Sequence, residues 1–113
     1  MMRAPILNRR LVLEQHYREP DGAGGYEEGW LALGTLWAEV RAGTGREQAG
    51  PGVPVGRVSY RITVPAAPVG ALARPRPDQR LREGPRIFRI QAVAEHGTRG
   101  AYLICFCDEE EPA

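Results

Sequence analysis

A glycine-rich turn with the sequence Asp21-Gly22-Ala23-Gly24-Gly25 lies between two strand-like segments of the chain. Three glycines within four positions allow positive φ angles and a tight reversal of the backbone. The segment before the turn, residues 10–17, reads RLVLEQHY, and the segment after it, residues 35–40, reads TLWAEV. Both segments carry β-branched and aromatic residues, which favour strands. We therefore predict that they pair as an antiparallel hairpin with a long loop.

Two tryptophans follow this turn, Trp30 five residues after Gly25 and Trp37 within the second strand-like segment. Aromatic side chains bury large areas in small domains. We predict that both tryptophans are anchors of the core, together with Tyr60 and Phe88 from segments further along the chain.

Three more segments have the character of strands. Residues 57–64 (RVSYRITV) alternate between apolar and polar side chains, as a half-buried strand does. Residues 86–95 (RIFRIQAVAE) follow the same pattern, which places four apolar side chains on one face: Phe88, Ile90, Ala92 and Ala94.

The last segment, residues 101–107 (AYLICFC), is apolar on both faces. Such a pattern suits a central strand or one whose outer face is covered by a neighbouring subunit. Short strands separated by turn signals are typical of a small antiparallel barrel or sandwich. We expect an all-β fold, a small antiparallel β-barrel of five to six short strands, in one domain over residues 1–113.

Two connections are long for such a domain, residues 41–56 and residues 65–85. Loops of more than about 12 to 15 residues are usually functional or disordered, so we expect at least one of them to be the working part. Residues 1–8 form an N-terminal arm, and residues 108–113 form an acidic tail. The tail is either a solvated terminus or a surface that docks an adjoining subunit.

The second long loop ends in a proline- and arginine-rich sequence. It is either a proline-stiffened, solvated connector or a contact for phosphate or an acidic partner. In the second case the contacts are Arg74, Arg76, Arg80, Arg82 and Arg86.

Composition excludes several classes of function. The formal net charge is +1, which does not indicate a protein that binds nucleic acid through a strong basic field. No apolar run is long enough to span a membrane, so we expect no membrane partner. Cys105 and Cys107 are two apart in a strand, where a disulfide would be strained, so we expect two reduced, buried thiols.

Catalytic and cofactor motifs are missing from the sequence. The glycines around residues 43–48 are not followed by the Lys-Ser/Thr pair of a phosphate-binding loop, and Ser59, the sole serine, lies within a strand. His16 and His96 do not have zinc-site spacing to each other or to the cysteines. We predict no enzyme activity, no metal and no cofactor.

Taken in order, these patterns resemble the phage head-tail joining family, the small stopper or head-completion connectors of long-tailed phages and gene transfer agents. The resemblance covers about residues 8–107. It rests on the first strand, the glycine-rich turn, the two tryptophans and the strand sequences at residues 60–63 and 86–93.

The resemblance implies a structural virion protein that forms a ring, six- or twelve-fold with six favoured, between head and tail. Its partners would be copies of itself, the adaptor and portal on the head side, and the tail terminator or tail tube. Double-stranded DNA would pass through the lumen without sequence-specific binding. The protein would assemble in the bacterial cytoplasm, retain packaged DNA and dock the tail.

In related stoppers a loop after the tryptophan-bearing strand reaches into the channel, and here that loop is residues 41–56. The implied channel residues are Arg41, Thr44, Arg46, Glu47 and Gln48. The alternative from the residues alone is a small β-barrel that binds nucleic acid through residues 74–86. No aromatic residues are interleaved with those arginines, although stacking platforms are usual in single-strand binders.

Overall fold

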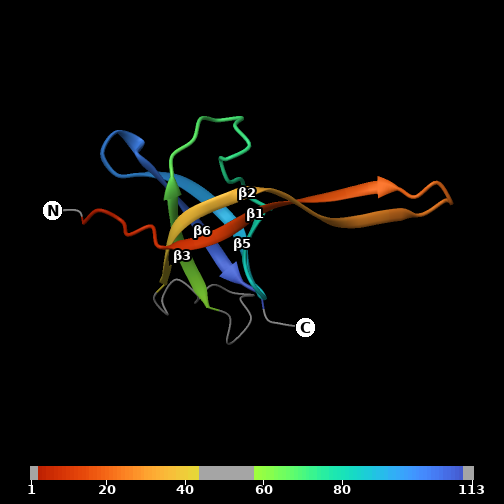
Figure 1. Cartoon of the computed structure of the whole chain (residues 1–113), viewed down its shortest axis with the longest axis horizontal. Helices are drawn as coiled ribbons and strands as arrows, with labels where there is room; N and C mark the ends of the chain where they lie inside the picture. The colour runs from red at the N-terminus through yellow and green to blue at the C-terminus, as the bar shows by residue number, and fades with distance from the viewer. Residues whose placement is uncertain (1–2, 44–57, 111–113) are drawn as a thin grey trace.

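The computed structural model describes residues 3–43 and 58–110. Six antiparallel strands close into a barrel in the order β1-β2-β3-β6-β5-β4, which confirms the expected all-β barrel (Figure 1). Within the described residues, no helix is long and apolar enough to cross a membrane. The elements are β1 Arg9–Pro20, β2 Tyr26–Ala42, β3 Ser59–Pro65, β4 Arg80–Glu83, β5 Arg86–His96, the short 3-10 helix η2 Thr98–Gly100 and β6 Tyr102–Glu109.

The predicted hairpin between β1 and β2 is present, and its strands are longer than the sequence indicated. Pairing continues to Pro20 opposite Tyr26, so the expected long loop is only residues 21–25. The sequence did not indicate this extension, because the residues that follow Tyr17 are polar and lack the apolar alternation of a half-buried strand.

The turn itself is held by the side chain of Asp21. Its carboxylate oxygen Oδ1 accepts hydrogen bonds from the backbone N–H groups of Ala23 and Gly25, at 2.8 Å and 3.0 Å. Gly22 and Gly24 have φ angles of 81° and 86°, a backbone conformation that favours glycine. These two glycines therefore have the positive φ angles that the sequence predicted, in a turn that is shorter than expected.

The core fills the barrel with side chains from all six strands, and Phe88 is its largest fully buried member. Strand alternation explains the membership of β6, where every second residue points inward. The buried apolar residues are Leu11, Leu13, Ala38, Ile62, Val64, Leu81, Phe88, Ile90, Leu103, Cys105 and Cys107. Cys105 and Cys107 are free and buried, as predicted.

A bulge in β5 overturns part of the predicted inward face. The register against β6 shifts between Ile90 and Ala92, so Gln91 is an extra residue. An inserted residue reverses the alternation that follows it. Val93 therefore packs against the core, while Ala92 and Ala94 are exposed, contrary to the prediction.

The segment at residues 65–85 is not one long loop, because β4 lies within it. This strand pairs with β1 and with β5 and so closes the barrel. Leu81 is its single apolar residue among three charged ones, which is why no strand pattern was visible. The predicted acidic tail is also wrong at its start, since Asp108 and Glu109 belong to β6.

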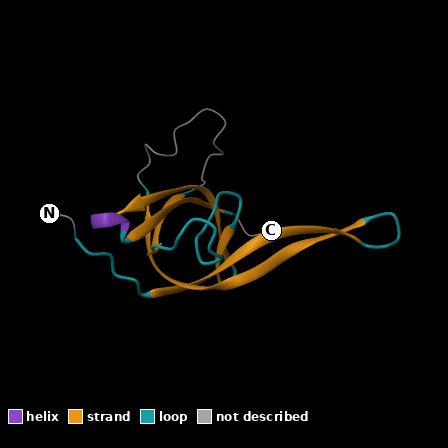
Figure 2. Ribbon diagram, turned by 90° about the horizontal axis from the view of Figure 1, so that it is seen from above, coloured by secondary structure: helices purple, strands orange, loops and turns teal. Residues whose placement is uncertain are grey.

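The distal part of the β1–β2 hairpin leaves the barrel as a two-stranded ribbon. We call this ribbon, residues 15–31, the arm; it is distinct from the N-terminal segment at residues 1–8. Beyond Glu14, β1 no longer pairs with β4, and β2 pairs with β3 only from Glu39 onward. Figure 2 shows the arm projecting from one end of the barrel, with the N-terminal segment and η2 at the other end. The longest dimension of the molecule is 58 Å.

Candidate assembly surfaces

A buried carboxylate ties the base of the arm to the barrel. Glu14, on β1, is only 5% exposed. It accepts hydrogen bonds from Nε of Arg80 at 2.7 Å and Nε of Arg82 at 3.0 Å. Burial by itself would raise the pKa of Glu14, but the two guanidinium groups outweigh burial and hold that pKa below its usual value.

The half-buried Trp30 forms the second tie at the base of the arm. Its ring lies 4.0 Å from the guanidinium carbon of Arg80 and 5.5 Å from that of Arg89. His16, directly opposite on β1, contacts the same ring edge to face at 5.2 Å. Trp30 thus anchors the arm to β4 and β5 through cation–π contacts, rather than lying in the barrel core.

Ion pairs close the end of the barrel at which β2 ends and β3 begins. Arg86 donates to Glu109 at 2.7 Å and 3.1 Å and to the Tyr60 hydroxyl at 3.2 Å. The hydrogen bonds raise the pKa of Arg86 and lower that of Glu109. Beside them, Arg9 pairs with Glu83, and this contact lowers the pKa of the Glu83 carboxyl.

The five arginines singled out in the sequence do not form one patch. Arg80 and Arg82 converge on Glu14, whereas Arg86 lies at the barrel end beside Tyr60. The other two bind neutral acceptors of their own chain: Arg74 the carbonyl of Ala67 at 3.0 Å, and Arg76 the side-chain oxygen of Gln15 at 3.0 Å. All five therefore have intramolecular partners.

The four predicted core anchors differ in how deeply their side chains are buried. Phe88 is fully buried, and the half-buried Tyr60 packs edge to face against it at 5.1 Å. Trp30 is half-buried at the base of the arm. Trp37 is 51% exposed, so the prediction that it lies in the core is wrong. Its position opposite Arg10 on β1 turns both side chains outward, with the guanidinium carbon 5.9 Å from the ring.

Of the predicted channel residues, only Arg41 lies in the described part of the chain. It belongs to β2 and pairs with Arg61 of β3, so it is a strand residue and not a loop residue. The other four lie outside the described residues: Thr44, Arg46, Glu47 and Gln48.

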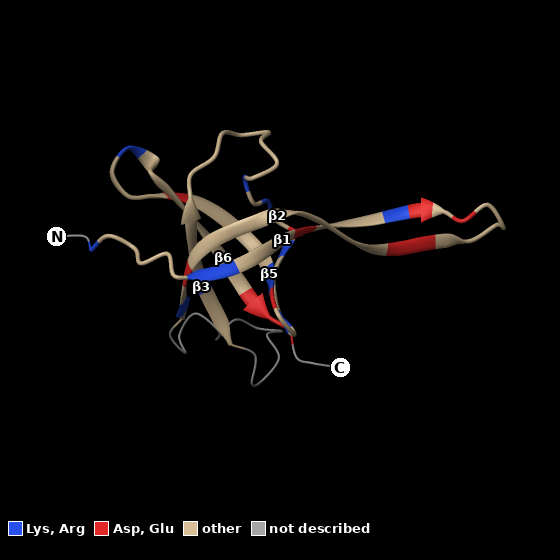
Figure 3. Ribbon diagram, viewed as in Figure 1, with Lys and Arg blue, Asp and Glu red and all other residues tan. Residues whose placement is uncertain are grey.

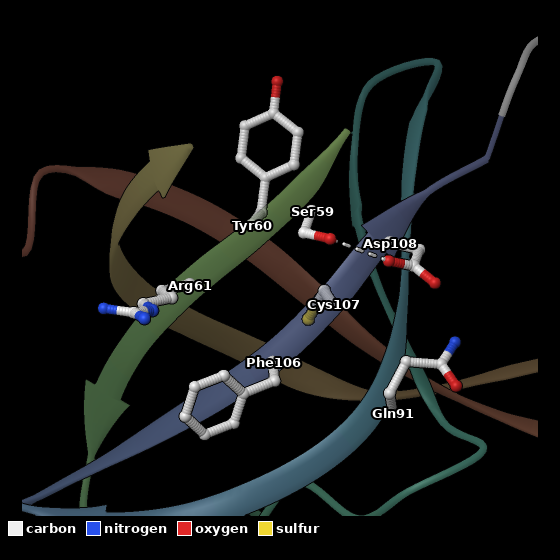
Figure 4. A pocket seen from close by; sticks show the side chains of 7 residues that line it. All are labelled: Ser59, Tyr60, Arg61, Gln91, Phe106, Cys107 and Asp108. Atoms are coloured by element: carbon white, nitrogen blue, oxygen red, sulfur yellow. Dashed lines mark hydrogen bonds between the residues drawn. The ribbon is translucent and has the colours of Figure 1, made fainter. Parts of the chain in front are cut away.

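The outer face of β6 carries a surface hollow of about 320 Å³. Figure 4 shows Phe106 and Arg61 at one side of it and Gln91, the bulge residue, at the other. Ser59 donates from Oγ to Asp108 at 3.3 Å at its rim. The apolar outer face predicted for residues 101–107 is therefore real, and the bulge that shapes it had no signal in the sequence.

The arm is the feature that the sequence predicted least well, whereas the sequence did predict the apolar outer face of β6. The arm exposes Tyr17, Tyr26 and Leu31, the last two by 58% and 56%. Exposed apolar side chains on a projecting ribbon, together with an apolar outer strand face, are typical of surfaces that meet other proteins. The sequence carries no clear signal for the arm, because the residues after Tyr17 are polar and do not alternate with apolar ones.

Comparisons with known proteins agree with this reading. A family model described as phage head completion protein matches residues 2–110. A solved chain from the virion of a native gene transfer agent particle is 57% identical, with a TM-score of 0.78 over 97% of this chain and 100% of that chain. A protein of Shigella flexneri 2a, solved in solution, shares the fold at 23% identity, with a TM-score of 0.68 and 96% of each chain covered.

No match is found among curated proteins. The family match extends over nearly the whole chain, from the first strand to the end of β6. The chain belongs to the phage head completion protein family.

Proposed function

We propose that this protein is a structural subunit of the connector between the head and tail of a phage-like particle, either a phage or a gene transfer agent. In this role, copies of the chain form a ring that adjoins the portal and adaptor assembly, retains packaged DNA and receives the tail. Family membership and the 57% identity to a chain in a gene transfer agent virion support the location.

The arm is the observation that carries the assembly role. A two-stranded hairpin on its own is marginally stable in water. Residues 17–29 nevertheless continue the ladder beyond the last strand of the barrel that could support them, and they expose aromatic side chains. A ribbon of this kind is explained by a protein surface that covers it in the assembled particle.

The charges at the barrel end suit a conduit for DNA. Arg9 and Arg86 are each matched by a carboxylate, at the end of the barrel where residues 44–57 connect β2 to β3. A ring repeats each side chain many times, and unmatched arginines would bind the phosphate backbone strongly. Paired charges let DNA pass without that binding. We assign the retention of DNA to the connection between β2 and β3. Arg41 and Ala42, the first two residues of the predicted loop at residues 41–56, belong to β2.

The alternative function, a free-standing barrel that binds nucleic acid, is weakened by the same contacts. Arg80, Arg82 and Arg86 hold carboxylates of their own chain. Phosphate would have to displace these carboxylates in order to bind.

A deletion of the gene, complemented with the wild-type copy as control, tests the proposed function. We expect the deletion strain to yield heads that lose their DNA and lack tails in electron micrographs, with little nuclease-protected DNA in the lysate. Normal tailed and filled particles from the deletion strain would refute the connector role.

A further inference from the structure

The loop between β3 and β4, residues 66–79, has its own internal hydrogen bonds and buried residues. Pro75 is fully buried, and Gln79 is only 2% exposed. The side chain of Arg74 donates to the carbonyl of Ala67 at 3.0 Å, which joins the two halves of the loop. Backbone N–H groups close three successive turns at 3.0 to 3.1 Å: Ala71 to the carbonyl of Pro68, Arg74 to that of Ala71, and Gln79 to that of Arg76. The loop is therefore a structural element and not a slack connection.

The last part of this loop is fixed to the barrel. The backbone N–H of Asp78 donates to the carbonyl of Ile90 at 3.1 Å, and the N–H of Ile90 donates to the carbonyl of Gln79 at 3.0 Å. The side-chain oxygen of Gln79 accepts from the backbone N–H of Arg76 at 2.8 Å. We call residues 74–79 the brace, because they are held against β5 at one end and contact the arm at the other.

The brace contacts the arm at the first residue of the arm, Gln15. The side-chain oxygen of Gln15 accepts from the side-chain nitrogen of Gln79 at 2.8 Å and from the guanidinium of Arg76 at 3.0 Å. An amide oxygen has two lone pairs, so these two donors use its full capacity. A hollow of about 130 Å³ separates the loop from Leu33 of β2. The brace thus binds one strand of the hairpin and lies beside the other.

The hairpin bends where the brace meets it. The register between β1 and β2 shifts between Leu13 and Glu14, and Leu33 is the extra residue on β2. A bulge of this kind bends a strand and increases its twist. Glu14 and Trp30, the other two ties of the arm, are beside the same bulge. Figure 3 shows basic positions of the loop and of β4 near the point where the arm leaves the barrel.

We propose that the brace fixes the direction in which the arm projects, with Gln15 and Arg76 as positioning residues. From Tyr17 to Gly29 the arm pairs only within itself, so among the described residues the contacts that limit its swing are those at its base. An element that already points in its bound direction loses less conformational freedom on binding. This inference rests on the proposed function. It gives the second long loop a role in assembly that is neither a solvated connector nor a phosphate contact.

Distances between two spin labels test the direction of the arm in the purified protein. The labels are attached at Ala23→Cys, in the turn of the arm, and at Ala94→Cys, on the exposed face of β5. The two native thiols are buried and take no label. The otherwise unchanged chain should give one narrow distance distribution. Gln15→Met, which loses both hydrogen bonds, should broaden the distribution about twofold or more, and the exposed Arg76→Met should broaden it less.

Two matched variants separate this effect from a general loss of structure. Gln15→Glu keeps an oxygen acceptor for both donors, so its distribution should stay narrow. Gln91→Met replaces an exposed glutamine on the bulge of β5, outside the brace, and should change nothing. Thermal melts of all variants show whether the barrel is still folded. Equally narrow distributions for Gln15→Met and Gln15→Glu would overturn the proposal, and so would a broad distribution before any change at the brace.

Particle assembly tests the consequence of a fixed direction. In complemented particles of the deletion strain, Gln15→Met should lower the yield of DNA-filled particles by about threefold or more, because the arm must then be ordered during assembly. Gln15→Glu should assemble normally. A broadened distribution with an unchanged yield would refute the role of the brace in assembly. Absence of the chain from purified particles would instead refute the connector role, and it would leave the spin-label result standing.

Discussion

At the scale of single residues, Glu14 joins three strands. It is a β1 residue, its two hydrogen-bond donors are on β4, and one of them, Arg80, also stacks on Trp30 of β2. A buried carboxylate between two arginines is costly to remove, because both cations would lose their acceptor. The base of the arm therefore depends on one acid.

Replacement of Glu14 by Gln should lower the free energy of unfolding by about 1 to 3 kcal/mol at pH 7. The folded state holds the pKa of Glu14 below its unfolded value of about 4.3, so the stabilisation is complete above that pH and is lost as pH falls through the folded pKa. Urea titrations at pH 7 and pH 3 should show the difference between wild type and variant shrinking in acid. An equal difference at both pH values would contradict the pairing.

Phe88 and Trp37 form a matched pair of large aromatic residues, one buried and one exposed. Phe88→Ala should cost about 3 to 5 kcal/mol of unfolding free energy, because it empties the centre of the core. Trp37→Ala in the isolated chain should cost less than about 1 kcal/mol, as expected for a surface change. Urea denaturation of both variants measures this, and a large loss for Trp37→Ala would show that its ring is buried in solution.

The two buried thiols of β6 provide a test of whether the core is closed to solvent. Burial raises the pKa of Cys105 to about 12, and it also raises that of Cys107, so little thiolate forms near neutral pH. An aromatic disulfide reagent at pH 8 should leave both thiols unmodified in the folded protein and label two per chain in strong denaturant. Fast labelling under native conditions would mean that β6 opens readily.

The residue types in the sequence predicted which segments contribute to the core better than they predicted which side chains of a strand point inward. Phe88 and Ile90 are inside as expected, yet Ala92 is outside because one bulged residue reverses the alternation. Trp37 illustrates a related limit, since size and hydrophobicity do not state which side of a strand faces inward. Register against the neighbouring strands decides that, and register depends on contacts between distant parts of the chain.

At the scale of elements, the arm is a ribbon whose ties to the barrel are at its base. Gln15 receives hydrogen bonds from Arg76 and Gln79, at 3.0 Å and 2.8 Å, and Trp30 stacks on two arginines. The segment from Tyr17 to Gly29 is paired only within itself. The strand pattern before and after the turn predicted a hairpin, but nothing local showed that it would outrun the barrel or that β4 would close the sheet.

Replacement of residues 19–27 by a short Asn-Gly turn should leave the barrel folded, since no core residue lies in that segment. We expect the thermal midpoint to change by no more than a few degrees, as for a surface change, and the yield of DNA-filled particles in complementation to collapse. Circular dichroism and nuclease-protection assays measure the two effects. Full assembly with the shortened arm would remove the arm from the particle contacts.

At the scale of the whole molecule, we expect the loop between β2 and β3 to contribute to function and little to the stability of the fold. Its flanking residues, Ala42 and Ser59, lie on neighbouring strands, so a shorter connection can bridge them. Shortening residues 44–56 should spare the thermal midpoint and reduce the DNA retained in assembled heads. Sedimentation of particles and assay of protected DNA test this, and unchanged retention would place the gate elsewhere.

The closed barrel has a consequence for the life of the subunit before assembly. Each barrel strand pairs with two neighbours over part of its length, whereas the arm pairs only within itself, so both of its outer backbone edges are open. Open edges invite unwanted strand addition, and charged side chains are a known safeguard against it. The carboxylates of the arm, including Glu19 and Glu27, lie along these open edges, where their charge opposes strand addition by another chain.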